Sequence, residues 1–298
     1  MAMGMGFCVG PALAAIVINW FGYLGTNLFF AVLILVIGLG GVLFIPARIN
    51  DGPKETIDPE EVTQRDIPYS AFLKNKWSLM ALLARTCVIM CLQFLDPILS
   101  LHMETLGWNL NDTGFAFALF SLTWGLGSPV AGLICQHVNR RVVILLFFIT
   151  VGVSLLLVGP SAVLGLHSSV GIVLVGLTFL GFGVAGCCVP VVPEMVSAIN
   201  EEESKKYGGE AKQNSQVNDK VSALYNMGFA VGAVLGPPIG GAIGDARGFS
   251  YTSDIFAMIA FAFAGVYLLV VVIPTWYFKK NNLDGKSKVE LTGIEETD

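Results

Sequence analysis

About eight apolar runs, each of ~20 residues or more, make up most of this chain. The hydrocarbon core of a bilayer is ~30 Å thick, and a helix needs ~20 residues to cross it. Backbone polar groups in lipid must be satisfied within the segment, so each run predicts a transmembrane α-helix. The predicted spans are residues 1–21, 26–46, 77–101, 113–136, 141–164, 169–199, 220–244 and 251–278. The expected fold class is therefore an all-α multi-pass membrane protein with the lipid bilayer as its surroundings.

The composition agrees with this class and excludes several others. Of the 298 residues, 54% are hydrophobic and 13% are charged, against ~25% charged in soluble domains. The sequence contains no basic cluster with interleaved aromatic residues, so it does not indicate binding to nucleic acid. Neither a nucleophile–base arrangement nor a phosphate-binding glycine loop is present, so we expect neither an enzyme nor a cofactor. The cysteines lack metal-ligand spacing and are interpreted as small residues of the apolar segments. They are Cys8, Cys87, Cys91, Cys135, Cys187 and Cys188.

The distribution of basic residues predicts the orientation. Of the 17 lysines and arginines, all but Arg85 and Arg247 lie in loops on one side of the predicted spans. Basic loops stay on the cytoplasmic side, so both termini and the loops 47–76 and 200–219 are expected there. The 200–219 loop and the tail 279–298 are polar and expected to be flexible. On the opposite side, Asn111 begins a glycosylation sequon very close to the membrane.

Glycines recur at every fourth position of residues 224–249, which places them on one face of a helix. They are Gly228, Gly232, Gly236, Gly240 and Gly244. Small residues let two membrane helices approach closely, and neighbouring helices can satisfy the backbone groups that prolines release. We therefore predict a membrane helix with a smooth face and a kink at Pro237–Pro238. Helix packing and a direct functional role are both possible reasons for the smooth face.

The first span is a second copy of this stretch, displaced by 226 residues. Gly10 and Pro11 correspond to Gly236 and Pro237, and Gly22 corresponds to Gly248. Parallel repeats within one chain are typical of transporter folds in which the substrate lies between two similar halves.

These features resemble the major facilitator superfamily, a transporter fold of twelve helices in two halves. The resemblance rests on the glycine-proline motifs GFCVGPALA (6–14) and GAVLGPPIGG (232–241) and on GLICQHVNRR (132–141), which ends in Arg140 and Arg141. In the third motif Gln136 replaces the family's acidic residue, so an ion pair at that position is not expected.

A closer resemblance is to the vesicular amine transporter family, in its polyamine transporter-like branch. It rests on FLDPILSLHMETLG (94–107), GLGSPVAGLI (125–134) and CVPVVPEM (188–195). The resemblance implies that the chain runs from helix five to helix twelve, as expected of a partial gene model or a truncated form. Residues 1–46 would be the last two helices of the first half, 47–76 a cytoplasmic linker with a short helix near 59–65, and 77–278 the second half.

Ionisable groups inside a membrane are costly and are functional candidates by default. Asp96 precedes Pro97, which loosens the helix and lets a carboxylate bind a cation or a proton. The resemblance implies an acidic residue at this position. Glu194 follows Pro190 and Pro193, which would expose backbone carbonyls. The alternative for Asp96 is an aspartate that lies near water at the membrane interface. The alternative for Glu194 is a carboxylate at a helix end in the headgroup region.

Four further side chains are candidates for lining a cavity: Asn226, Tyr225, Gln93 and Trp124, with Ser128 beside them. Trp124 or Tyr225 could present an aromatic face to an ammonium group. The resemblance implies an acid at Asn226 in monoamine transporters, so its amide argues against monoamine chemistry.

Three other ionisable residues lie near span ends. Arg85 either extends to the cytoplasmic surface or pairs with Glu194. His102 and Glu104 are expected at the surface outside their span.

The resulting hypothesis is a proton-coupled antiporter that moves organic cations, polyamines or related amines, across vesicle membranes by alternating access. An efflux carrier for drugs or other organic cations is the alternative with the same fold. A non-transporting regulatory protein is the alternative from another class.

Overall fold

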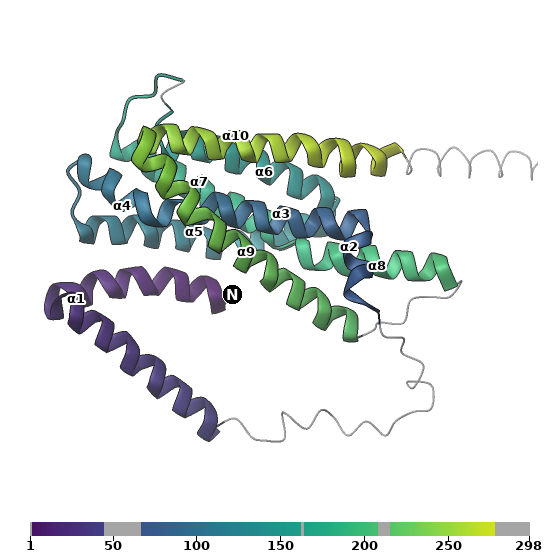
Figure 1. The fold of residues 1–298 in the computed structure, drawn as a ribbon, viewed down its shortest axis with the longest axis horizontal. Coiled ribbons are helices and arrows are strands. Elements are labelled where there is room, and N and C mark those ends of the chain that lie inside the picture. The colour runs from purple at the N-terminus through teal and green to yellow at the C-terminus, as the bar shows by residue number, and fades with distance from the viewer. Residues whose placement is uncertain (1, 45–66, 162–163, 208–214, 278–298) are drawn as a thin grey trace, which may run out of the picture.

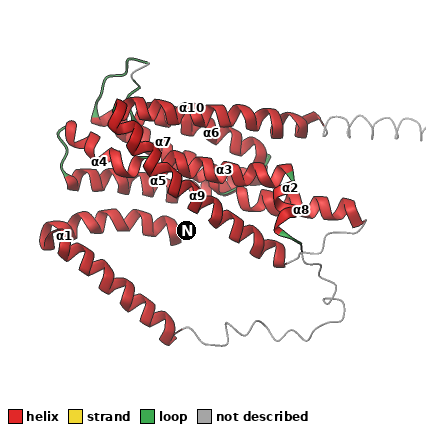
Figure 2. Ribbon diagram, in the orientation of Figure 1, coloured by secondary structure: helices red, strands yellow, loops and turns green. Residues whose placement is uncertain are grey.

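The computed structural model describes residues 2–44, 67–161, 164–207 and 215–277. Helices make up almost all of these residues, and they contain no strand (Figure 2). The predicted helix at 59–65 and the tail 279–298 lie outside the described residues. The helices are α1 (Ala2–Phe44), α2 (Tyr69–Lys74), α3 (Lys76–Gln93), α4 (Leu95–Thr105), α5 (Leu110–His137), α6 (Arg140–Val158), α7 (Val170–Cys188), α8 (Val191–Tyr207), α9 (Ser215–Arg247) and α10 (Phe249–Tyr267), which continues as a π-helix, η3 (Leu268–Val272).

Seven helical segments in the described part of the chain are long and apolar enough to cross a membrane. The first of them, Ile16–Phe44, joins residues that were predicted as two spans. Gly22 has non-helical dihedral angles inside α1 and divides it into two arms, as Figure 1 shows. The predicted spans are therefore confirmed as helices, and the first two predicted spans meet at Gly22.

Helices α3 to α10 form a bundle whose buried core lies between α3, α5, α6, α7 and α10 (Figure 1). Phe94 and Phe256 stack at the centre of this core, with ring centroids 4.0 Å apart. Helix α1 lies against α5. The outer faces of the helices carry many exposed leucine, valine and phenylalanine side chains, as expected for surfaces that contact lipid.

The glycine face of α9 is the surface on which α3 and α4 pack. A Cβ atom added at Gly232 would lie 2.6 Å from the carbonyl oxygen of Thr86. One added at Gly240 would lie 2.7 Å from the Cβ of Phe94. The close packing predicted from the sequence is therefore confirmed, and any larger residue would separate the two helices. Helix α9 is continuous through Pro237 and Pro238, so the helix does not end at these prolines.

The internal repeat is visible in the backbone. Gly22 and Gly248 occupy equivalent positions of the two copies, and both have positive φ angles, 66° and 85°. Their ψ angles of −176° and 170° are also close. This conformation strongly favours glycine. In each copy the glycine ends the Gly-Pro helix and starts the next one, so the two matching residues make the same turn.

Two breaks divide the long predicted spans. Pro97 cannot donate the backbone hydrogen bond that the carbonyl of Gln93 would accept in a continuous helix. Helix α3 ends at Gln93 and α4 begins at Leu95. In the same way α7 ends at Cys188 and α8 begins at Val191, on either side of Pro190. These breaks place Asp96 and Glu194 on the first turns of new helices.

Candidate functional site: a cavity with one carboxylate

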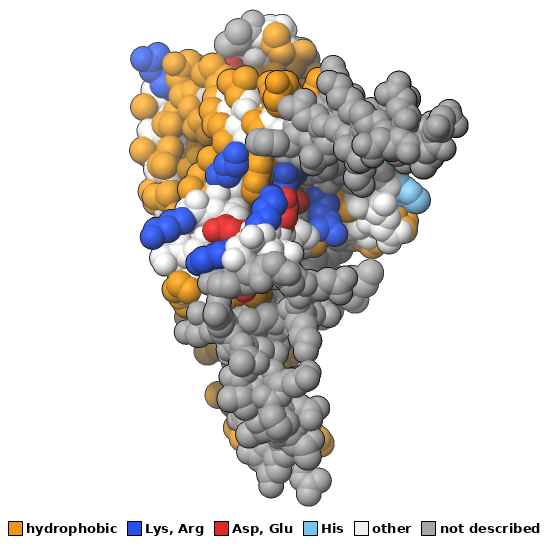
Figure 3. Space-filling model, turned by 90° about the vertical axis from the view of Figure 1, so that its right-hand side faces the viewer, with side chains coloured by type: hydrophobic (Ala, Val, Ile, Leu, Met, Phe, Trp, Pro, Cys, Tyr) orange, Lys and Arg blue, Asp and Glu red, His pale blue; other side chains and the backbone are white. Residues whose placement is uncertain are grey.

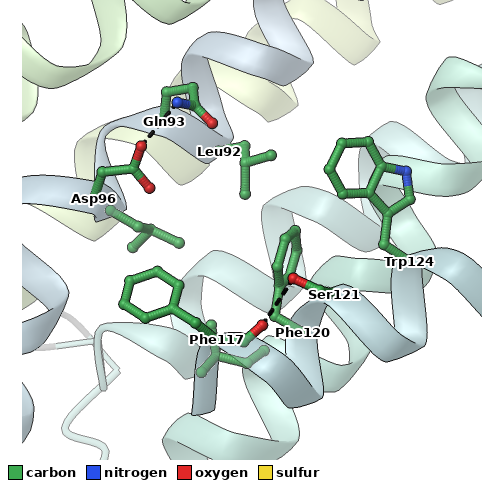
Figure 4. A pocket seen from close by; sticks show the side chains of 9 residues that line it. Leu92, Gln93, Asp96, Phe117, Phe120, Ser121 and Trp124 are labelled. Atoms are coloured by element: carbon green, nitrogen blue, oxygen red, sulfur yellow. Dashed lines mark hydrogen bonds between the residues drawn. The ribbon is translucent and has the colours of Figure 1, made fainter. Parts of the chain in front are cut away.

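A cavity of about 330 Å³ lies between the α3–α4 break, α5 and α7. Three of the predicted site residues, Gln93, Asp96 and Trp124, line it (Figure 4). The remaining lining residues are Leu92, Leu95, Phe117, Phe120, Ser121 and Leu177. Asp96 is the ionisable residue among the nine, so this cavity combines one carboxylate with a mainly apolar wall.

The α3–α4 break positions the carboxylate. Asp96 lies in the first turn of α4, and its Oδ2 accepts a hydrogen bond of 2.8 Å from Nε2 of Gln93 on the last turn of α3. The helix N-terminus also favours a negative charge at this position. One carboxylate oxygen carries the bond to Gln93, which leaves the other oxygen available to bind a cation.

Helix α5 supplies the aromatic wall opposite Asp96 (Figure 4). Phe117, Phe120 and Trp124 follow one another at intervals of three and four residues, so they share one helix face. The rings of Phe120 and Trp124 are 5.9 Å apart. Ser121 donates its hydroxyl hydrogen to the carbonyl of Phe117 at 2.9 Å. Ser128 was also predicted as a candidate for lining a cavity. Its hydroxyl donates to the carbonyl of Trp124, and it does not line this cavity.

The other predicted residues lie elsewhere. Asn226 is exposed on α9, and neither it nor Tyr225 lines the cavity. The ring of Tyr225 lies 4.1 Å from the guanidinium carbon of Arg85. The aromatic face that we predicted for a substrate ammonium is therefore already covered by a cation of the protein. The side chains of Pro11 and Asn111 lie outside the described residues, although the backbone of Asn111 belongs to the first turn of α5.

Both expectations for Arg85 are wrong. The side chain is 1% exposed, so it does not reach the surface, and Glu194 pairs with another residue. Its Nη1 donates to Sγ of Cys188 at 2.5 Å. His102 also differs from expectation, because its half-buried ring stacks on Phe249 with centroids 4.3 Å apart. Sequence gives the depth of a residue along a helix but not the direction in which its side chain points.

Lysine and arginine side chains gather at one end of the bundle, which is called the basic end below (Figure 3). Glu194 belongs to a polar network with Arg140 and Arg141. Its Oε1 accepts from Nε of Arg141 at 2.5 Å, and Nη1 of Arg141 donates to Thr275 at 2.7 Å. The guanidinium of Arg141 lies 4.3 Å from the centre of the Trp77 ring. The network thus joins α3, α6, α8 and the segment that follows η3.

Arg140 extends the same network along α8. Its Nη1 donates to the carbonyl of Pro193 at 3.1 Å and to the hydroxyl of Ser197 at 2.8 Å. The carbonyls expected to be exposed are those four residues before each proline, Gly186 and Val189, so this contact does not test that prediction. The sequence did not indicate an ion pair for the Arg140–Arg141 motif, because Gln136 stands at the acidic position of that motif. The acid comes from α8 instead, as Glu194.

We predict that Glu194→Gln lowers the free energy of unfolding by about 3 kcal/mol, because it leaves Arg141 buried without its counter-charge. The two side chains are 7% and 13% exposed. The matched control is Glu201→Gln, which breaks the Glu201–Lys205 pair of α8 with side chains 56% and 74% exposed. That change is expected to cost less than about 0.5 kcal/mol. Denaturant unfolding of the detergent-solubilised protein measures both, and equal effects would contradict the assignment.

Six of the nine cavity residues were not predicted. The face of α5 offered a usable signal, since Phe117 and Phe120 precede Trp124 at helical spacing. The contribution of Leu177 had no signal, because it depends on how α7 packs beside α5. In the network at the basic end, Trp77 and Thr275 were missed for the same reason.

The sequence profile of the Major Facilitator Superfamily matches residues 1–209 and 81–295, which together cover most of the chain. The chain belongs to the major facilitator superfamily. The two matches overlap, as expected for a superfamily built from repeated halves.

Individual relatives of the chain are distant. It is 27% identical to the MFS-type transporter SLC18B1 of Rattus norvegicus, over 98% of this chain and 60% of the relative. It is 26% identical to the synaptic vesicular amine transporter of the same species, over 88% of this chain and 46% of that protein. A multi-drug resistance efflux pump PmrA homologue of Lactococcus lactis is 25% identical over 93% of this chain and 61% of the pump. The chain thus spans about half to three fifths of the length of these relatives.

Proposed function

We propose that this chain belongs to a proton-coupled antiporter for organic cations, with polyamines and related amines as the class that the sequence resemblance suggests. The observation that carries the proposal is the single carboxylate of Asp96 in a largely apolar cavity between membrane helices. A carboxylate holds an ammonium group by charge, and the apolar wall holds the rest of the amine. The names of the relatives, amine transporters and an efflux pump, support the same class.

In the proposed mechanism an amine and a proton compete for Asp96. When a proton binds the carboxylate, the charge that holds the ammonium is removed and the amine leaves. When the proton leaves, the carboxylate can bind the next amine. Because one site is shared, each movement of a proton out of the acidic vesicle lumen is exchanged for the movement of an amine into it. The alternation between the two sides is a shift between two conformations, each favoured by a different ligand.

The network at the basic end has a place in this scheme. It holds α3, α6 and α8 together through Arg141 and Glu194. We propose that access to the cavity from this side requires the Arg141–Glu194 pair to open. We also propose that this end is cytoplasmic, since it carries the basic loops, and that the membrane is that of a vesicle.

Uptake by the purified protein in proteoliposomes tests the proposal. With an acidic interior, serotonin, spermidine and a cationic dye are offered in parallel. We expect concentrative uptake of at least one amine, and its loss when a protonophore collapses the gradient. Uptake that persists without the gradient would contradict proton coupling. Uptake of the dye alone would favour the efflux carrier, and binding without uptake would favour a regulatory protein.

A further inference from the structure

A second carboxyl group lies in the membrane-spanning part of α10, outside the cavity. Asp254 is the sixth residue of the span Phe249–Tyr277, about 8 Å along the helix from its start. The residue is 4% exposed. Both of its side-chain oxygens are buried, and neither makes a hydrogen bond or an ion pair among the described residues. Because these oxygens are already covered, a segment that packs on the outside of the bundle does not reach them.

Asp254 faces α6 at a contact made without ionisable side chains. Ser250 and Phe261 lie four residues before and seven residues after it, on the same face of α10. A Cβ added at Gly159 of α6 would lie 3.4 Å from Cα of Ser250. One added at Gly152 would lie 2.6 Å from Cε1 of Phe261. Asp254 therefore lies between these two contacts, and the α6 residues between the two glycines include no ionisable one.

The hydroxyl groups around this contact donate their hydrogens to backbone carbonyls. On α10, Thr252 donates to the carbonyl of Gly248 at 2.8 Å. Ser253 donates across the contact to the carbonyl of Leu155 at 2.7 Å. On α6, Ser154 donates to a carbonyl of its own helix at 2.6 Å. An ionised carboxylate only accepts hydrogen bonds, whereas a protonated carboxyl group can donate one, so these surroundings suit the protonated form.

The ionisable groups of the other neighbouring helices leave the charge of Asp254 without a partner. Helix α10 also packs against α3, α4 and α9. At this end of the bundle the ionisable residues of the four helices are Cys91, His102, Glu104, Asp245, Arg247 and Tyr251. The two basic ones have other contacts: His102 stacks on Phe249, and Arg247 lies 5.4 Å from the centre of the Tyr251 ring. The remaining ionisable residues of these helices lie nearer the basic end, apart from Asp96 in the cavity.

Burying an ionised carboxylate without donors is strongly unfavourable, and such a group takes up a proton instead. We propose that Asp254 is a proton-binding site, separate from the cavity of Asp96, and that it carries a proton while α6 and α10 are packed together. Its ionisation requires water to reach the carboxyl group, so it requires α6 and α10 to separate. The site does not depend on the proposed amine site, because the nine residues that line the cavity come from α3, α4, α5 and α7.

Infrared spectroscopy tests the protonation directly. A protonated carboxyl group has a carbonyl band at higher frequency than the amide bands, and this band shifts when D2O replaces water. We expect the purified protein in detergent at neutral pH to show such a band, and Asp254→Asn to lack it. Asp96→Asn is the matched control and should keep this band, because it removes the acid of the cavity instead. Equal spectra of the unchanged protein and Asp254→Asn in this region would overturn the proposal.

Thermal unfolding tests the same assignment independently. Asp254→Asn and Asp254→Leu remove the proton-binding group and keep a side chain of similar size. A neutral, unpaired acid forms no ion pair that these variants could lose, so we expect at least one of them to unfold at or above the midpoint of the unchanged protein. Glu194→Gln, which does lose an ion pair, should unfold below it. Failure of both Asp254 variants to fold, or a fall in both as large as in Glu194→Gln, would overturn the proposal.

The link between the proton and the α6–α10 contact is tested by hydrogen exchange. Opening that releases one proton becomes about tenfold more favourable for each unit of pH. Exchange of the backbone amides of α6 and α10 should therefore rise with pH more steeply in the unchanged protein than in Asp254→Asn, by up to about tenfold per unit. Mass spectrometry measures both proteins at each pH. An equal pH dependence in the two proteins, while the carboxyl band is present in the unchanged one, would overturn this link.

Discussion

Asp96→Asn is expected to weaken the binding of serotonin about 100-fold and to abolish proton-driven amine uptake. Asp96 is exposed to the cavity, and the bound amine would bury the charge pair; losing one member of such a pair costs about 3 kcal/mol, which is on the order of 100-fold in affinity. Asparagine keeps the shape of the side chain, and its amide can still bond to Gln93, so the break between α3 and α4 should persist. Radioligand binding and proteoliposome uptake measure the two effects.

Glu104→Gln is the matched control for this variant. Glu104 lies on the same helix, α4, and is exposed as Asp96 is, but it does not line the cavity. Its neutralisation should change serotonin binding less than about twofold, because exposed charges are screened by salt. Unchanged binding in Asp96→Asn, or an equal loss in Glu104→Gln, would remove Asp96 from the site.

The second large effect is expected at the contact between α9 and α3. Gly232→Ala should lower the free energy of unfolding by about 2 kcal/mol or more, since inserting atoms into a packed contact costs ~1–3 kcal/mol. The new Cβ would meet the backbone oxygen of Thr86 and the Cβ of Ile89, at 2.6 Å and 2.9 Å. Backbone atoms cannot turn away as a flexible side chain can, so the helices must move apart. Thermal unfolding of the solubilised protein measures the loss.

Gly241→Ala on the same helix separates packing from helix propensity. A Cβ added at Gly241 meets nothing within 4 Å. Alanine favours the helical state over glycine by ~1 kcal/mol, so this variant should be neutral or slightly more stable. Similar losses in Gly232→Ala and Gly241→Ala would show that the glycine face is not a packing surface. We propose that this smooth surface also lets α9 slide against α3 during alternating access.

The helices and their repeat could be predicted because they depend on local chemistry. Apolar length fixes the number of spans to within one, and the four-residue period of the glycines identifies the face that packs. The correspondence of Gly22 with Gly248 was readable in the sequence, and the backbone repeats the same turn at both. The breaks beside Asp96 and Glu194 could also be predicted, because a proline removes a hydrogen bond within its own helix.

The contacts of charged side chains could not be predicted, because they depend on the rotation of each helix within the bundle. Arg85 and Glu194 lie at similar predicted depths in the membrane, and this alone made an ion pair between them plausible. The structure instead joins Glu194 to Arg141 and buries Arg85 against Tyr225. Only three of the nine cavity residues were predicted: Asp96, Gln93 and Trp124 are unusual residues for a membrane helix, whereas the leucines and phenylalanines of the cavity resemble residues that contact lipid.

The central claim is that an amine and a proton compete for the carboxylate of Asp96. The most direct test is the number of protons released when serotonin binds, measured by calorimetry in two buffers with different ionisation enthalpies, over a range of pH. The account predicts that the unchanged protein releases protons at the acidic end of that range and that Asp96→Asn, titrated at the highest concentrations it allows, releases none. Binding to the unchanged protein without proton release at any pH, or equal release by both proteins, would contradict it.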